Sequence, residues 1–152
     1  RSDDHTMLSF LRERAIDLAF VCESHVGLLR RISSLCAEVD GGVEVAQATS
    51  ALMERERLGS VVVAPGIALP HARVGGINEP VVAVVRTVHP VAFDEGAVTL
   101  SVGILTPEQA TSTHLELLRF WASLLRDDAA RGALLRLEDP SQVMSVVGAH
   151  RC

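Results

Sequence analysis

The residues best suited to chemistry gather around His71. The stretch from Val61 to Arg73 reads V-V-V-A-P-G-I-A-L-P-H-A-R, a β-branched run that breaks at Pro65-Gly66 and continues to Pro70 and His71. Pro70 fixes its own φ and lacks a backbone donor, so His71 follows a stiff point in the chain. Near neutral pH an imidazole is partly unprotonated and can attack phosphorus. A histidine after a strand is more often a hydrogen-bonded structural residue, so a chemical role depends on the groups around it.

A second candidate histidine lies at a predicted helix start. Thr113 as N-cap and Glu116 three residues later have the spacing of a capping box, which makes His114 the first residue of the helix. A helix N-terminus offers free N–H groups and a positive dipole end, which suit an anion such as a phosphoryl group. The alternative is a histidine that points into solvent.

The elements that must position these residues alternate between strands and helices. The predicted strands cover residues 15–21, a run from Val61, residues 80–88 and residues 97–105. The predicted helices cover residues 24–39, with Ser24 as N-cap, 43–57 and 127–137, with two further helices from Thr113 and Asp139. Residues 88–90 and 93–96 are assigned to the connection between the last two strands. His71 is assigned to a loop, and residues 106–113 to a polar loop that ends at the helix from Thr113. The inward faces are predicted to carry Leu28, Leu29, Ile32, Leu35, Cys36, Val45, Ala48 and Leu52, and in the helix from Thr113 Leu115, Leu118, Ala122 and Leu125, with Trp121 at the edge.

Composition narrows the class of protein. A chain of 152 residues with 48% hydrophobic and 3% aromatic content fits one domain with an aliphatic core. The net charge of −5 argues against a nucleic-acid surface. No apolar run approaches the roughly 20 residues that cross a bilayer. Three cysteines without C-x-x-C spacing favour neither a disulfide framework nor a zinc site, and no cofactor is expected. The polar residues 1–6 are predicted to be disordered or foreign to the natural chain, and residues 7–152 to form the domain.

Several separated motifs carry a family resemblance. The segment G-I-A-L-P-H-A-R, the preceding Glu54-Arg55-Glu56 and Leu58-Gly59-Ser60, and T-H-L-E-L-L from Thr113 agree in order and spacing. The chain thereby resembles, from about residue 8 to 147, the type-2 enzyme IIA domains of the bacterial phosphoenolpyruvate:sugar phosphotransferase system. These are the mannitol/fructose-type domains, with ascorbate-type and nitrogen-regulatory relatives. The resemblance implies an α/β fold with a mixed β-sheet flanked by helices in a single domain.

The resemblance also assigns roles to residues. It implies that His71 accepts a phosphoryl group through Nε2, with its other ring nitrogen held by a hydrogen bond, and that His114 and Arg55 lie beside it. From the residues alone, the E-R-E-R run that contains Arg55 is most simply interpreted as a solvated helix end. An arginine suits the role because its fork supplies two donors to phosphate oxygens and stays protonated. The residues expected to bind the phosphoryl group or the partner protein are Arg73, Gly66 and Thr113.

Two positions depart from the family pattern. Many relatives have G-x-G where this chain has Ala64-Pro65-Gly66, and many have a threonine in place of Val61. The first difference bears on the flexibility of the loop and the second on a hydrogen bond near the site. Neither removes the acceptor histidine.

Three functions are compatible with this resemblance. The first is a cytoplasmic phosphotransferase that accepts a phosphoryl group from phospho-HPr and passes it to a IIB domain for sugar uptake, with a slight preference for the ascorbate type. Its partners would be these proteins and no nucleic acid, without membrane insertion but compatible with association with a membrane permease. The second is a regulatory IIA-like domain whose phosphorylation controls partner binding. The third is a degenerate domain that binds a small anion.

Overall fold

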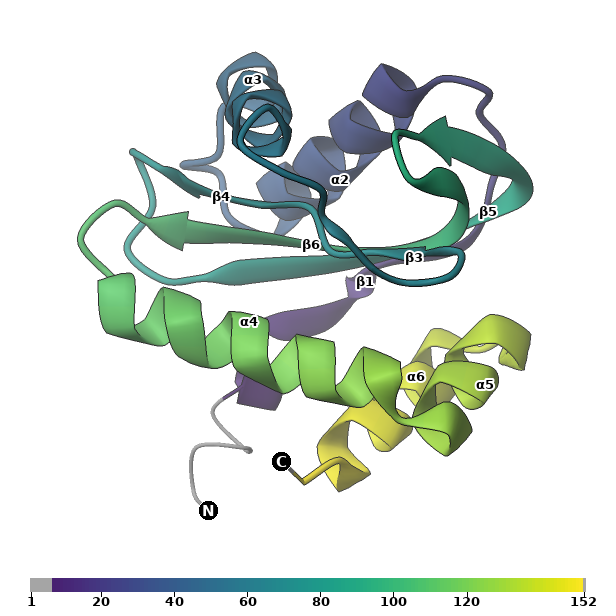
Figure 1. The fold of residues 1–152 in the computed structure, drawn as a ribbon. Helices are drawn as coiled ribbons and strands as arrows, with labels where there is room; N and C mark the ends of the chain where they lie inside the picture. The colour runs from purple at the N-terminus through teal and green to yellow at the C-terminus, as the bar shows by residue number, and fades with distance from the viewer. Residues whose placement is uncertain (1–6, 152) are drawn as a thin grey trace.

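The computed structural model describes residues 7–151. Residues 1–6, for which disorder or a foreign origin was predicted, and Cys152 lie outside the described residues. Within it, a mixed sheet of six strands has the order β1-β5-β6-β3-β2, and β4 also pairs with β6 (Figure 1). The strands are β1 (Leu11–Phe20), β2 (Val62–Ala64), β3 (Ile67–Ala68), β4 (His71–Val74), β5 (Val81–Phe93) and β6 (Gly96–Pro107). The helices are α2 (His25–Val39), α3 (Val45–Glu56), α4 (Thr111–Arg126), α5 (Asp128–Arg136) and α6 (Pro140–Ala149).

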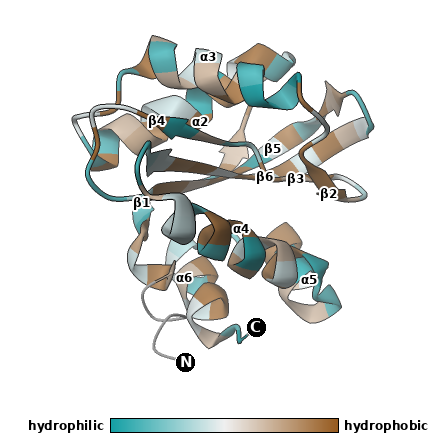
Figure 2. Ribbon diagram, turned by 60° about the vertical axis from the view of Figure 1, so that its left-hand side comes forward, coloured by the Kyte–Doolittle hydropathy of each residue, from teal (hydrophilic) through white to brown (hydrophobic). Residues whose placement is uncertain are grey.

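Helices cover both faces of the sheet. Figure 1 shows α2 and α3 on one face and α4, α5 and α6 on the other. Each layer has its own core, because alternate residues of β5 and β6 point to opposite faces. Figure 2 shows the central strands in hydrophobic colours between these helices. The predicted α/β architecture is therefore confirmed. No helix among the described residues combines the length and the apolar character that crossing a bilayer requires.

The helix predictions near the N-terminus are confirmed. Ser24 caps α2, and its side chain accepts a hydrogen bond from the backbone N–H of Gly27. The five inward residues predicted for this helix are all buried. In α3, Ala48 and Leu52 are buried as predicted, whereas Val45 is only half-buried in the first turn.

The connection predicted between the two long strands is shorter than expected. Residues 88–90 belong to β5, and the turn of the hairpin is confined to Asp94 and Glu95. The pairing of β5 with β6 shifts register between Arg86 and Val91. An irregularity of this kind accommodates Pro90, which cannot donate to a regular ladder.

The prediction for the start of α4 is wrong. The helix begins at Thr111 with Ala110 as N-cap and no side-chain cap, so Thr113 is a helical residue and not the N-cap. The backbone N–H of His114 donates to Ala110 O at 2.9 Å and is not free for an anion.

The predicted inward face of α4 is also wrong in phase. Of the four positions predicted inward only Leu125 is buried, and Leu115 is 53% exposed. The large rings of Phe120 and Trp121 are buried instead, and burying them sets the rotation of the helix because aromatic side chains contribute the largest apolar area. The buried residues of α4 are His114, Leu117, Phe120, Trp121, Leu124 and Leu125.

The segment that carries His71 forms a broken strand alongside β6. Gly66, at φ 79°, makes the turn between β2 and β3, and both β3 and β4 run parallel to β6. Between them, the backbone N–H of Leu69 donates to Val61 O at 2.8 Å and Ile104 N–H donates to Pro70 O at 2.9 Å. His71 is therefore the first residue of a strand, not part of a loop as the sequence suggested.

Candidate functional site

Both ring nitrogens of His71 take part in hydrogen bonds. Its Nδ1 lies 2.8 Å from Leu69 O, and because a carbonyl oxygen can only accept, Nδ1 carries the proton of this hydrogen bond. The Nε of Arg55 donates to Nε2 of His71 at 3.1 Å. Nε2 therefore holds the unshared electron pair, and the tautomer is the one in which Nε2 is the nucleophile.

Arg55 reaches His71 from the last turn of α3. Its Nη1 also donates to Gly59 O at 3.0 Å, in the turn that follows the helix. The side chain is half-buried. One guanidinium thus links the helix end, the following turn and the imidazole, which is an arrangement that the fork geometry of arginine permits.

His114 faces His71 from the second layer of helices. The centroids of the two rings are 5.5 Å apart, although the residues belong to α4 and β4. Nδ1 of His114 lies 2.6 Å from Oγ1 of Thr106, and both side chains are buried. The structure therefore brings together the two histidines that the sequence placed 43 positions apart (114 − 71 = 43).

Arg73 completes the positive rim of the site. Alternation along β4 places His71 and Arg73 on one face, while Ala72 and Val74 are buried in the core below α2 and α3. Nη1 of Arg73 donates to Oγ1 of Thr111 at 3.2 Å. A pocket of about 550 Å³ opens here, lined by Ala51, Glu54, Arg55, Leu58, His71, Ala72, Arg73, His114, Leu115 and Leu118.

Two of the predicted site residues do not line this pocket. Gly66 lies at the turn between β2 and β3, where its nearest neighbours are Ala97 O and the Thr99 side chain. Thr113 sits within the first turn of α4 and makes no cap.

Three site groups were not identified from the sequence. They are the hydroxyl of Thr106, the carbonyl of Leu69 and the hydroxyl of Thr111. Each acts by holding another side chain, and a backbone carbonyl or a threonine carries no recognisable pattern. The Thr-Pro at residues 106–107 was assigned to a polar loop, whereas Thr106 is a buried residue at the end of β6.

The surroundings keep both imidazoles neutral. Burial lowers the pKa of His71; its hydrogen bond to Leu69 O raises it in part, and the charge of Arg55 lowers it further. Burial lowers the pKa of His114 to about 4, with added repulsion from His71, Arg73 and Arg55. At neutral pH the pocket therefore presents two uncharged rings between two guanidinium groups, which suits an incoming anion.

The lowered pKa of His114 predicts a pH-dependent stability. His114 takes up a proton near pH 6.5 in the unfolded chain but only near pH 4 in the folded chain. The neutral ring therefore contributes to the free energy of unfolding above pH 6.5, and this contribution is lost as the pH falls toward 4. Between pH 7.5 and 4.5 the wild type should lose about 2 kcal/mol more stability than His114→Gln. Urea unfolding at the two pH values measures this. The control His89→Gln, at an exposed position, should track the wild type; equal losses in His114→Gln and wild type would contradict the prediction.

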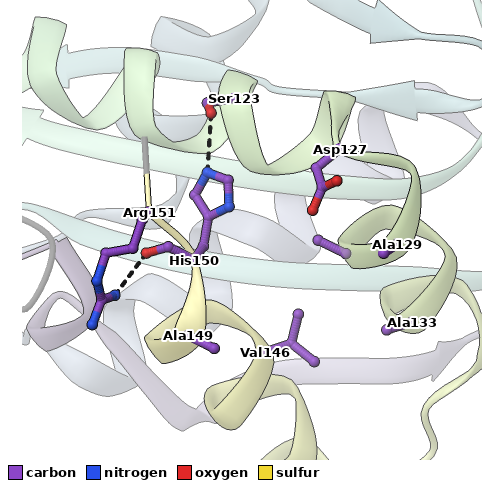
Figure 3. A pocket seen from close by; sticks show the side chains of 9 residues that line it. Ser123, Asp127, Ala129, Ala133, Val146, Ala149, His150 and Arg151 are labelled. Atoms are coloured by element: carbon purple, nitrogen blue, oxygen red, sulfur yellow. Dashed lines mark hydrogen bonds between the residues drawn. The ribbon is translucent and has the colours of Figure 1, made fainter.

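A second pocket lies at the other end of α4 (Figure 3). It has a volume of about 630 Å³ and is walled mainly by α4, α5 and α6. Ser123 Oγ lies 3.0 Å from His150 Nε2, and Arg151 donates to the backbone oxygens of Gly148 and His150. In Figure 3 the carboxylate of Asp127 lies to one side of the imidazole, and Nε2 of that ring is hydrogen-bonded to Ser123. None of the site residues that were predicted from the sequence lines this pocket.

The family follows from a comparison of the whole chain. Residues 9–149 match the model of the family described as "Phosphoenolpyruvate-dependent sugar phosphotransferase system, EIIA 2". The chain belongs to this family. The resemblance inferred from the motifs is thereby confirmed, and the protein is a type-2 IIA domain.

Relatives of this IIA domain carry two kinds of name. A "Nitrogen regulatory protein" of Pseudomonas aeruginosa is 48% identical over 77 residues, which cover 49% of this chain and 50% of the relative. The "PTS system fructose-specific EIIA component" of Haloferax volcanii is 31% identical over 103 residues, covering 66% of this chain and 67% of the relative. The crystal structure of nitrogen regulatory protein IIA-Ntr from Neisseria meningitidis has a TM-score of 0.84 at 29% identity, covering 93% of this chain and 99% of that one.

Proposed function

We propose that this IIA domain is a phosphocarrier whose His71 accepts a phosphoryl group from the phosphohistidine of phospho-HPr. The observation that supports it is the paired hold on His71: Leu69 O fixes Nδ1–H, and Nε2 presents its electron pair toward Arg55. Nε2 attacks phosphorus, a new N–P bond forms, and the donor's N–P bond breaks with its electron pair retained by the donor imidazole. The reaction is then mostly positioning and charge stabilisation.

Arg55 changes partner during this step. In the structure described here its Nε donates to the same Nε2 that must attack, so the guanidinium has to swing away before the phosphoryl group arrives. Its donors then turn to the phosphoryl oxygens, where charge-assisted hydrogen bonds are stronger than a bond to neutral imidazole. Arg55 thus occupies the electron pair of Nε2 before the reaction and binds the phosphoryl oxygens after it.

His114 and Arg73 complete the anion site in this proposal. Oγ1 of Thr106 lies 2.6 Å from Nδ1 of His114. We propose that this hydroxyl donates to Nδ1, so that the ring proton is on Nε2 and can be donated to a phosphoryl oxygen. The low pKa of His114 keeps it neutral, so it donates without transferring its proton. Arg73 stands at the rim, exposed to a docking protein, together with Leu58 and Leu115, which are 85% and 53% exposed.

For the onward step, we propose transfer from His71 to the cysteine of a IIB domain in the cytoplasm. A solved complex of enzyme IIA and phosphorylated enzyme IIB for mannitol from Escherichia coli has the same fold, with a TM-score of 0.74 at 17% identity. The carried sugar would be set by the IIB partner. The slight preference for the ascorbate type stays a prediction, since the relatives described above are named for nitrogen regulation and fructose.

A regulatory output is the second candidate function. It is favoured by the 48% identity to a nitrogen regulatory protein and by the fold similarity to IIA-Ntr. The same chemistry at His71 would then change the affinity of the domain for a partner protein, and the phosphoryl group would not be delivered to a sugar. The two candidates share the acceptance step and differ only after it.

Labelling with phosphoenolpyruvate, enzyme I and HPr tests the acceptance step. The IIA domain should acquire a label that is acid-labile and base-stable, as a phosphohistidine is. Omission of HPr serves as the control, and absence of label with all components present would contradict the proposal. Chase of the labelled domain with IIB domains of the ascorbate, fructose and mannitol types should discharge it in the transport case. Retention of the label with all three supports the regulatory output.

A further inference from the structure

We propose that Glu56 and His25 are positioning residues that hold Arg55 against His71. This proposal rests on the phosphoryl-accepting role of His71 proposed above. Glu56 is the last residue of α3 and His25 the first residue of α2. Their pairing joins two helix ends next to the arginine that contacts the nucleophile.

The contact is short and sheltered. Nε2 of His25 lies 2.9 Å from Oε1 and 3.1 Å from Oε2 of Glu56, and only 14% of the Glu56 side chain is exposed. The ring of His25 also packs on Phe93, with centroids 4.2 Å apart. Phe93 belongs to the buried core, so the pair is anchored to the end of β5. Asp94, next along the chain, adds a second carboxylate near Glu56.

The pattern of α3 explains why its last turn needs such a contact. The inward face of the helix carries Ala48 and Leu52, and the next positions on that face are 55 and 56. Both positions hold charged residues, Arg55 and Glu56, so no apolar side chain fixes the final turn to the core. Helix ends fray when packing does not hold them. The polar contacts of these two side chains therefore position the end of the helix.

The Arg55–His71 contact and the Glu56–His25 contact behave differently during phosphoryl transfer. Arg55 must release Nε2 of His71 for the attack, so its hydrogen bond to the imidazole is broken in each cycle. The bond between Glu56 and His25 involves neither atom of that contact and persists throughout. It keeps the end of α3 in place while the guanidinium moves from the imidazole to the phosphoryl oxygens. Loss of the pair would increase the freedom of Arg55 and slow the step that needs it.

A double-mutant cycle in the rate of labelling from phospho-HPr tests this role. Glu56→Ala should slow labelling about tenfold in wild type but have little effect in an Arg55→Ala background, because positioning residues couple through the group they position. Glu56→Gln retains an oxygen that accepts from His25 and should recover most of the rate. Glu38→Ala is the control and should label at the wild-type rate, because it removes the same charge from an exposed position of α2 that does not line the pocket around His71.

The second readout needs no partner protein. In nitrogen-15 NMR titrations, Glu56→Ala and Arg55→Ala should each raise the pKa of His71, because each weakens the contact of the guanidinium with Nε2, and the double variant should raise it no further. Equal labelling rates and an unchanged His71 pKa in Glu56→Ala would overturn the proposal, as would equal slowing in the two backgrounds. Failure of the wild type to label would instead contradict the phosphocarrier function and leave the titration to decide the role of Glu56.

Discussion

Replacing His71 by alanine should abolish phosphoryl acceptance. Labelling from phospho-HPr is expected to fall by at least about a thousandfold, to the background level, because the variant lacks the Nε2 electron pair that forms the N–P bond. Neither His114 nor His25 is expected to substitute in place: the ring of His114 is buried and in the proposed tautomer has its proton on Nε2, and Nε2 of His25 is engaged by Glu56. Quantification of the acid-labile label against time measures the loss.

The matched control for this prediction is His89→Ala. His89 is an exposed histidine on β5, so this variant should label like the wild type. Circular dichroism should show the same helix content for both variants, since the half-buried ring of His71 fills a pocket and not the core. Undiminished labelling of His71→Ala would remove this residue from the acceptor role and transfer the question to the remaining histidines.

The second large effect is expected at Gly103, in the centre of β6. A Cβ at this position would lie 2.2 Å from Cγ2 of Ile32, a residue of α2 that is fully buried. The helix packs directly on the backbone of the strand, so Gly103→Ala forces α2 away from the sheet or Ile32 into another rotamer. We expect a loss of about 3 kcal/mol in the free energy of unfolding, measured by urea denaturation.

Two further variants define the cause of that loss. Gly41→Ala is the control, because a Cβ there meets no atom within 4 Å, and stability should change by no more than about 0.5 kcal/mol. Ile32→Ala removes the methyl group that clashes, so the double variant should be less destabilised than the sum of the two single changes. Additive losses would show that Gly103 stabilises the strand for a reason other than close approach of α2.

Local features of the sequence were sufficient for much of the fold. The Ser24 cap, the apolar face that follows it and the strand-forming run after Pro80 predicted α2 and the start of β5, because capping and periodicity act within a few residues of the chain. Where local signals competed with packing, the predictions were wrong. Thr113 and Glu116 have the spacing of a capping box, yet burial of Phe120 and Trp121 sets the phase of α4.

Residue types and spacing were enough to identify the groups that could do the chemistry. Pro70-His71, the arginine of the E-R-E-R run and His114 were identified from residue types, spacing and a family resemblance. Their proximity in space depends on the tertiary structure. The parallel pairing of β4 with β6 brings His71 toward Thr106 and His114, and the end of α3 delivers Arg55 from the opposite layer. The contacts that hold these side chains (Leu69 O, Thr106, and the Glu56–His25 pair) join residues whose partners the chain order does not reveal. Hydrogen bonding and burial depend on position in space, and that position follows only from the packing of helices on both faces of the sheet.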